Sequence, residues 1–145
     1  MLETYQIIAV LGNVGKKGSR PPANNLELAL ALRSGLSYAT ITQLVKHTGF
    51  SALRIFAAVN LSARTMERRK KQRKLSTDES QKIARFARVV ALGDAVFEDP
   101  QVTSRWLERS NTALGGLLPM ELLDTEEGAR EVESVLRRLE SGIYS

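Results

Sequence analysis

LGGLLPMELLDTEEGAREVESVLRRLESGIYS, residues 114–145, is the stretch that predicts most about the fold of this chain. Pro119 stands where a proline opens a helical turn, and Asp124-x-x-Glu127 has the spacing of a helix-capping pattern. An apolar face then recurs at helical spacing, at Ala129, Val132, Val135, Leu136 and Leu139. Gly142 is a suitable helix end. The stretch therefore predicts a short turn followed by one amphipathic helix.

A cationic segment upstream has the features of a helix-turn-helix. Ser51 precedes a short apolar segment, a tight turn follows at Asn60-Leu61, and Ser62 precedes ARTMERRKKQ, in which Met66 is expected to pack inward. Two short helices joined by three or four residues form this DNA-binding motif, and the second helix enters the major groove. The candidate DNA contacts are Ser62, Arg64, Thr65, Arg68, Arg69, Lys70, Lys71 and Arg73. The competing interpretation is a solvated charge run on an exposed helix.

Capping residues divide the rest of the chain into further helices. The expected helix starts are Asn24 or Asn25, Ser37, Ser76 in a capping box with Glu79, and Asp99 before Pro100. The expected helix ends are Gly35, a position near His47, and Gly93. Glycines and prolines before residue 24 predict an irregular arm, in which residues 5–11 form a short strand or an ordered segment. Because no pair of strands is evident, the chain is expected to be all-α.

The 145 residues carry a net charge of +5, but the two signs are separated along the chain. Residues 1–94 hold 16 Lys and Arg against 6 Asp and Glu, whereas residues 95–145 hold 5 against 10. This separation indicates two partners, nucleic acid for the basic part and a cationic protein surface for the acidic part. The absence of cysteine excludes disulfides, and no apolar run is long enough to span a membrane. A cytoplasmic location is expected.

Three features suggest small-molecule or metal sites, but each fits another interpretation better. The segment Gly12-Asn-Val-Gly-Lys-Lys-Gly18 lacks the four residues that the phosphate-binding loop requires between its first Gly and Gly-Lys. His47 is the only histidine, and no cysteine is present to complete a metal site. Most of the acidic residues near the C-terminus are expected to lie on the solvated outer faces of a helix. They are Asp124, Glu126, Glu127, Glu131 and Glu133. We therefore expect no enzyme activity, no metal and no cofactor.

Two stretches of the chain resemble parts of one protein family. Residues 114–145 resemble the C-terminal toxin-binding domain of the Xre/MbcA/ParS-type antitoxins, in which L-G-G-x-x-P-x-E-L-L-D-T-x-x-G-A-x-x-V recurs nearly intact. Residues 49–80 are similar to the phage-repressor-like domain of the same antitoxins, through G-F-S and L-S-A-R-T-M-E-R-R-K-K. Asn60 and Ala63 depart from the family, which often has Gly and Pro there.

The resemblance implies that different segments of the chain have different functions. An irregular arm (1–23) would precede a helix-turn-helix DNA-binding and dimerisation domain (24–94) and a small helical toxin-binding domain (95–145). The protein would be an antitoxin that occludes the active site of a RES-domain, NAD-degrading toxin and represses its own operon at operator DNA. The candidate toxin contacts are Glu121, Asp124, Glu127, Arg130, Glu131, Arg138, Ile143, Tyr144 and Ser145.

The assembly is expected to be symmetric. DNA readers of this type bind two half-sites, so a homodimer within a higher toxin–antitoxin complex is expected. Helix 24–34 and the N-terminal arm are the candidate dimer contacts. The alternative function is that of a helix-turn-helix transcriptional regulator whose C-terminal domain only mediates oligomerisation.

Overall fold

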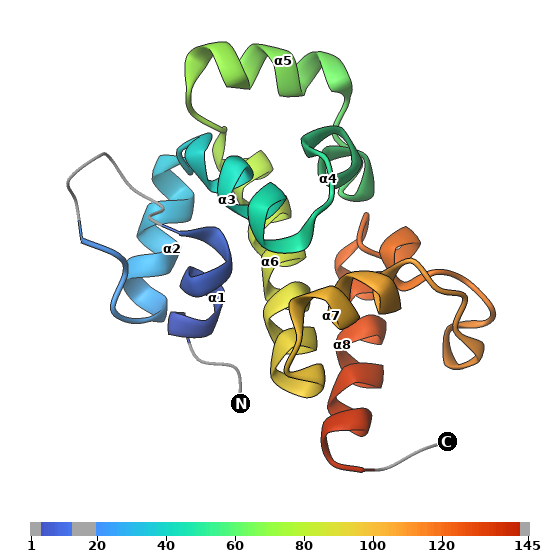
Figure 1. The fold of residues 1–145 in the computed structure, drawn as a ribbon. Helices are drawn as coiled ribbons and strands as arrows, with labels where there is room; N and C mark the ends of the chain where they lie inside the picture. Colours follow the sequence, from blue (N-terminus) through green and yellow to red (C-terminus); the bar gives the residue numbers. More distant parts are fainter. Residues whose placement is uncertain (1–3, 13–19, 143–145) are drawn as a thin grey trace.

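A computed structural model of the chain describes residues 4–12 and 20–142, which form helices and no β-strand (Figure 1). This confirms the all-α class. The α-helices are α1 (Thr4–Leu11), α2 (Asn25–Ser34), α3 (Ala39–Thr48), α4 (Ala52–Ala58), α5 (Ala63–Gln72), α6 (Thr77–Phe97), α7 (Pro100–Leu107) and α8 (Glu126–Glu140). Two 3₁₀ turns, η1 (Thr112–Leu114) and η2 (Pro119–Leu122), lie between α7 and α8.

The long helix α6 is the centre of the fold, and α1, α2, α7 and α8 all pack against it (Figure 1). Its start is fixed locally, because the Ser76 side chain accepts from the Glu79 amide and the Glu79 side chain accepts from the Ser76 amide. A helix that is apolar around most of its circumference has to be covered by other helices. The buried apolar side chains of α6 are Ile83, Ala84, Phe86, Ala87, Val89, Val90, Ala91 and Leu92.

α6 does not end at Gly93, so that prediction is wrong. The helix continues to Phe97 and ends at Glu98, which has a left-handed φ of 58°. Gly93 lies inside the helix because α7 approaches it closely: a Cβ at this position would lie 2.5 Å from Cγ2 of Thr103. The predicted domain boundary between residues 94 and 95 therefore falls inside α6. The boundary itself stays a prediction.

Residues 4–11 form the helix α1, which corrects the expectation of a strand or an irregular arm. Ile7, Val10 and Leu11 are buried at i, i+3 and i+4, and α1 packs on α6 and α3. The helix ends where the glycines begin, since Gly12 has a φ of 73°. The rest of the predicted arm includes residues 1–3 and 13–19, which lie outside the described residues.

Most predicted helix caps are confirmed. Side chains of Asn24, Ser51, Ser62, Ser76 and Asp99 accept hydrogen bonds from backbone amides in the first turns of α2, α4, α5, α6 and α7. Two caps differ by one residue. Tyr38 precedes α3, although the Ser37 hydroxyl accepts from the Ala39 amide, and Thr125 rather than Asp124 caps α8 through the Gly128 amide.

α8 covers one side of α6 with the apolar face that the sequence predicts (Figure 1). Ala129, Val132, Val135 and Leu136 are buried against the core, and Leu139 is half-buried. Before α8, the chain passes through Gly115 and Gly116, which both have positive φ, and then through the turn η2. The predicted short turn followed by one amphipathic helix is confirmed.

Candidate functional site

α4 and α5 form the two helices of a helix-turn-helix. Between them, the Leu61 amide donates to the Phe56 carbonyl at 2.8 Å, and Asn60 takes a left-handed φ of 60°. Asparagine tolerates this conformation better than most residues, which explains why it can stand at a position that often holds glycine. The tight turn presents α5 at one end of the molecule, away from α8 (Figure 1).

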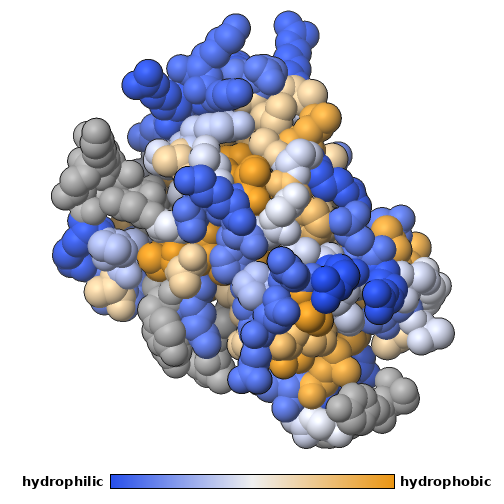
Figure 2. All heavy atoms as spheres, viewed as in Figure 1, coloured by the Kyte–Doolittle hydropathy of each residue, from blue (hydrophilic) through white to orange (hydrophobic). Residues whose placement is uncertain are grey.

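The outer surface of α5 is strongly cationic, and none of its residues is fully buried. Figure 2 shows hydrophilic side chains covering the end of the molecule where α5 lies. Of the eight predicted DNA contacts, the exposed ones are Ser62, Arg64, Arg68, Lys70, Lys71 and Arg73. Arg64 and Arg68 lie one helical turn apart, as phosphate or base contacts from a groove-bound helix require. Met66 packs inward, as predicted.

Arg69, also a predicted DNA contact, faces α6 instead. Its Nε donates to Oε1 of Glu79 at 2.7 Å, and its Nη2 donates to Oε2 of Glu79 at 3.1 Å. Burial alone would raise the pKa of Glu79, but the hydrogen bonds from Arg69 and from the Ser76 amide outweigh burial and hold this pKa below its ordinary value. The pair joins the DNA-binding helix to the start of α6.

The C-terminal end of α5 is tied to the N-terminal part of the domain. The Tyr38 amide donates to the Arg73 carbonyl at 3.0 Å, and the Leu75 amide donates to the Leu36 carbonyl at 2.9 Å. The Tyr38 ring packs on Phe56 with 6.4 Å between ring centres. Burial, together with the nearby charge of Glu67, raises the pKa of Tyr38. α5 is thus an exposed helix that is held by the Arg69–Glu79 pair and by backbone hydrogen bonds just after its C-terminal end, and it has no fully buried residue.

The second candidate surface is the outer side of α8, but two of the carboxylates expected to be solvated are instead paired with α6. Glu133 is buried and accepts from Nε of Arg88 at 3.2 Å. Glu126 lies 3.2 Å from Nη2 of Arg88 and 3.8 Å from Nη1 of Arg85. The expectation of a uniformly solvated acidic face is therefore wrong for these two residues, because arginines that lie far away in sequence neutralise them.

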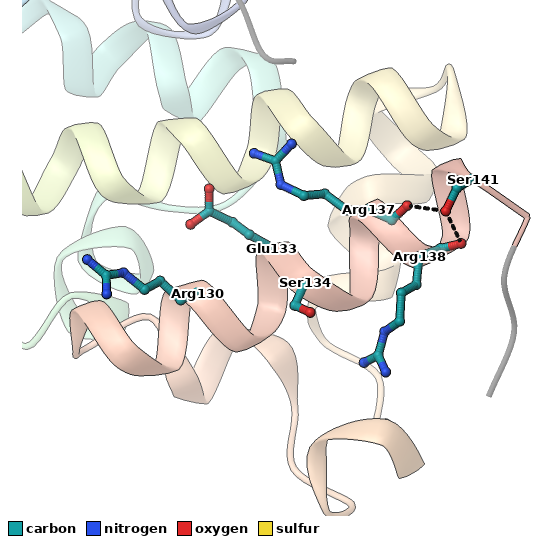
Figure 3. Close-up of a pocket in the computed structure, with 6 residues that line it drawn as sticks. All are labelled: Arg130, Glu133, Ser134, Arg137, Arg138 and Ser141. Atoms are coloured by element: carbon teal, nitrogen blue, oxygen red, sulfur yellow. Dashed lines mark hydrogen bonds between the residues drawn. The ribbon is translucent and has the colours of Figure 1, made fainter.

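The outer side of α8 also carries arginines, with Arg137 and Arg138 in its last turn beside Glu140. A hollow of about 440 Å³ lies along the helix and is lined by Arg130, Glu133, Ser134, Arg137, Arg138 and Ser141 (Figure 3). Arg137 and Arg138 extend to different sides of the helix in this view, with the small side chain of Ser134 one turn before them. Among the described residues, neither arginine forms an ion pair. Basic residues in a last helical turn also complement the helix dipole.

A set of polar contacts joins α3, α6 and α7. His47 Nε2 lies 2.6 Å from Oδ2 of Asp94, whose other oxygen accepts from Thr103 at 2.7 Å. His47 is therefore a half-buried structural residue that links α3 to α6. The Ser104 hydroxyl donates to the Thr48 carbonyl at 2.7 Å. A second hollow of about 530 Å³ lies at this junction of α3 and α7.

The turn before α8 explains the glycine in the D-T-x-x-G pattern. The Gly128 amide donates to the Thr125 hydroxyl at 3.0 Å, which caps the helix. The Leu122 carbonyl lies directly against Gly128, so that a Cβ there would come within 2.1 Å of its oxygen. Only glycine allows η2 and α8 to approach this closely.

The remaining predicted toxin contacts divide into exposed residues and residues that the structure does not describe. The side chains of Glu121, Asp124, Glu127, Arg130 and Glu131 are exposed, and that of Arg138 is half-buried. Ile143, Tyr144 and Ser145 lie outside the described residues. Arg137, which is not among the predicted contacts, lines the same hollow as Arg130 and Ser134 and follows them at i+7 and i+3.

Comparison with known proteins identifies two domains in the chain. Residues 27–88 match the Antitoxin Xre-like helix-turn-helix domain, and residues 92–142 match the Antitoxin Xre/MbcA/ParS C-terminal toxin-binding domain. The protein named Antitoxin Xre of Photorhabdus laumondii is 32% identical over 127 residues, which cover 86% of each chain. The chain belongs to the Xre family of antitoxins.

Other relatives of this Xre-family chain support the same assignment. Antitoxin Xre of Yersinia enterocolitica is 30% identical over 127 residues, again covering 86% of each chain. The protein named Prs ADP-ribosylating antitoxin of a Sphingobium strain is 34% identical over 101 residues, which cover 63% of this chain and 64% of that relative. The predicted family, with a helix-turn-helix domain and a toxin-binding domain, is confirmed.

Neither a metal site nor a membrane-spanning helix is found among the residues that the structure describes. No group of three or more His, Cys, Asp or Glu side chains there is placed to hold a metal ion. None of the described helices combines the length and the apolar character needed to cross a membrane.

Proposed function

We propose that this Xre-family antitoxin neutralises a RES-domain toxin that degrades NAD and represses its own operon by binding operator DNA. The observation that carries the proposal is the separation of two unlike surfaces on one chain: the cationic helix α5 at one end, and α8, within the toxin-binding domain, away from it (Figure 1). The name of the Sphingobium relative associates an antitoxin with ADP-ribosylation, a reaction that consumes NAD. This association supports a toxin that acts on NAD.

The proposed toxin surface combines both signs of charge. Glu127, Arg130 and Glu131 are exposed in the first half of α8, and Arg138 lies in its last turn. Charged groups of this kind determine which partner docks and in what register, more than how tightly it binds. The residues after Gly142 would extend from the end of α8 into the toxin cleft and exclude its substrate.

The proposed DNA surface should give strongly salt-dependent binding. Each phosphate that a cation neutralises releases counterions, so the logarithm of the affinity falls with the logarithm of the salt concentration by roughly 0.9 per phosphate. About five contacts from α5 predict a slope of roughly −4.5 on a promoter duplex. A slope near zero would contradict groove binding by α5.

The proposed homodimer has a candidate surface on α2. Leu26 is 70% exposed and Leu30 is 47% exposed, and the two lie one helical turn apart. Isolated exposed leucines are ordinary, but an adjacent pair on one helix face suits the apolar centre of a small symmetric interface. Sedimentation of Leu26→Ser/Leu30→Ser protein tests this surface, since the double variant should be monomeric.

The experiment that tests the function removes Ile143–Ser145 and measures toxin inhibition and promoter binding side by side. The truncated chain should inhibit the toxin less, because the cleft is no longer filled, and should bind the promoter duplex as the full chain does. Unchanged inhibition would contradict occlusion by the tail. A full chain that binds the promoter but no toxin would favour a transcriptional regulator whose C-terminal domain only mediates oligomerisation.

A further inference from the structure

We propose that Arg69 positions the DNA-binding helix through its ion pair with Glu79 and does not itself contact DNA. Sequence reasoning grouped Arg69 with the cations of α5 that meet phosphates, but the structure separates it from them. The proposal goes beyond the antitoxin assignment, because it concerns how the helix-turn-helix is held rather than what the protein inhibits. It rests on three observations: the weak anchoring of α5, the geometry of the pair, and the burial of Glu79.

α5 has few other means of keeping its orientation. It has no fully buried residue, and its apolar contact with the core comes from Met66, which is only half-buried. Backbone hydrogen bonds fix the chain after the helix, at Arg73 and Leu75. In the middle of the helix, the side chain of Arg69 is the polar contact that reaches across to α6. A helix held in this way can rotate or tilt when that contact is lost.

Three of the five N–H groups of Arg69 are engaged within the protein. Nε and Nη2 form a forked pair with the two oxygens of Glu79, and Nη1 donates to Oε1 of Gln72 at 2.8 Å. Forked arginine–carboxylate pairs fix both distance and angle, which a lysine cannot reproduce. The Arg69 side chain is 22% exposed, whereas Arg68 beside it is an exposed residue. A phosphate that drew Nε or Nη2 of Arg69 away from Glu79 would break the fork.

Breaking the fork is unfavourable because of where Glu79 lies. Its side chain is only 9% exposed, and its remaining partner is the Ser76 amide at 2.9 Å. A carboxylate left without its cation at a nearly buried position loses a charge-assisted hydrogen bond and keeps its desolvation penalty. The exposed cations of α5 are free to meet phosphates without any such penalty. DNA binding is therefore expected to leave the Arg69–Glu79 pair intact.

Arg69→Lys and Glu79→Gln separate positioning from phosphate contact. Arg69→Lys keeps the positive charge and loses the fork, and Glu79→Gln keeps an oxygen for the Ser76 amide and loses the negative charge. Affinity is measured for a duplex of the chain's own promoter and for a scrambled duplex, across a series of salt concentrations. Arg68→Gln is the matched control on the exposed side. Urea unfolding first establishes that each variant is folded under the binding conditions.

If Arg69 is a positioning residue, both variants lower the ratio of promoter affinity to scrambled-duplex affinity. The expected decrease is on the order of tenfold, because this is the change in affinity that corresponds to the loss of one charge-assisted hydrogen bond. Their salt slopes stay at the wild-type value, and the double variant loses no more than either single variant. Arg68→Gln reduces the slope by roughly 0.9 on both duplexes, because it removes a phosphate contact.

The opposite result is equally distinct. If Glu79 merely restrains a DNA-contacting arginine, Glu79→Gln strengthens binding to both duplexes and makes the salt slope steeper, while Arg69→Lys binds as the wild type does. That outcome overturns the proposal. A second measurement does not depend on the promoter. Amide hydrogen exchange of α5 should accelerate in Arg69→Lys and remain unchanged in Arg68→Gln. Equal exchange in the two variants would also overturn the proposal.

Discussion

Nε of Arg88 lies 3.2 Å from a carboxylate oxygen of Glu133, so the central helix α6 holds α8 through a charged hydrogen bond as well as through apolar packing. The same guanidinium reaches Glu126 at 3.2 Å. One arginine in the middle of the chain therefore fixes two turns of the helix that carries the proposed toxin surface. The placement of that surface depends on residues that belong to the other half of the sequence.

Glu133→Ala should destabilise the fold, and Glu131→Ala should not. Glu133 is 11% exposed at its side chain and shares Arg88 with Glu126, so its removal leaves a half-buried guanidinium with one partner. Loss of such a hydrogen bond costs about 1–3 kcal/mol. Glu131 is exposed on the same helix, so the free energy of unfolding of Glu131→Ala should stay within about 0.5 kcal/mol of the wild-type value. Urea unfolding measures both, and equal effects would contradict the role given to the Arg88 pair.

Gly93→Ala should destabilise the wild-type protein and be tolerated when Thr103 is changed to Ser. The added Cβ would lie 2.5 Å from Cγ2 of Thr103, a clash that costs about 1–3 kcal/mol in a packed core. Thr103→Ser removes that methyl group and keeps the hydroxyl that donates to Asp94. In the Thr103→Ser background, Gly93→Ala should raise the free energy of unfolding by up to about 1 kcal/mol, because alanine has the higher helix propensity. A double-mutant cycle without coupling would exclude this contact as the reason for the glycine.

Gly128→Ala tests the junction between η2 and α8. In an exposed helix this substitution is stabilising by about 1 kcal/mol, but here the new Cβ meets the Leu122 carbonyl. Because the backbone has to move, we expect the free energy of unfolding to fall by about 2 kcal/mol or more. Toxin binding should weaken as well. Ser134→Ala, on the exposed middle of α8, is the control and should be neutral or slightly stabilising. If Gly128→Ala is as stable as this control, the close approach of η2 does not constrain the site.

Glu79 should give the fold an acid-dependent component of stability. Its folded-state pKa lies below the ordinary value, so the charged form favours folding. The contribution is complete above the ordinary glutamate pKa and is lost as the pH falls through the lower folded-state pKa. Glu79→Gln should thus be less stable than wild type at pH 7, and the difference should shrink below about pH 4. A difference that stays constant from neutral to acid pH, measured by urea unfolding, would contradict the stabilising role of the charge.

Local signals in the sequence were sufficient for the helix starts. Ser51, Ser62 and Ser76 cap their helices because the capping bond joins residues three apart and needs no distant partner. The same holds for the apolar face of α8, whose spacing alone predicts which side is buried. The turn at Asn60 was also predictable, since asparagine adopts the left-handed conformation with little strain.

Several features that the sequence did not predict involve partners that are distant in sequence. Arg69 was grouped with the DNA contacts because its position on a basic helix is visible, whereas Glu79, to which it pairs, becomes a neighbour only after α6 docks. Glu133 was assigned to a solvated face because Arg88 lies 45 residues earlier. Gly93 was taken as a helix end because glycine often ends helices, yet α7 requires it inside one. Tertiary contacts overrule local preference in each case.

The measurement that tests the central claim most directly is co-expression of this chain with the proposed RES-domain toxin, scored by growth and by cellular NAD. The toxin alone should arrest growth and deplete NAD. The chain should restore both, and Glu133→Ala and Gly128→Ala should restore them less, in proportion to their loss of folded α8. Growth arrest and NAD depletion that persist beside a folded, abundant chain would contradict the account.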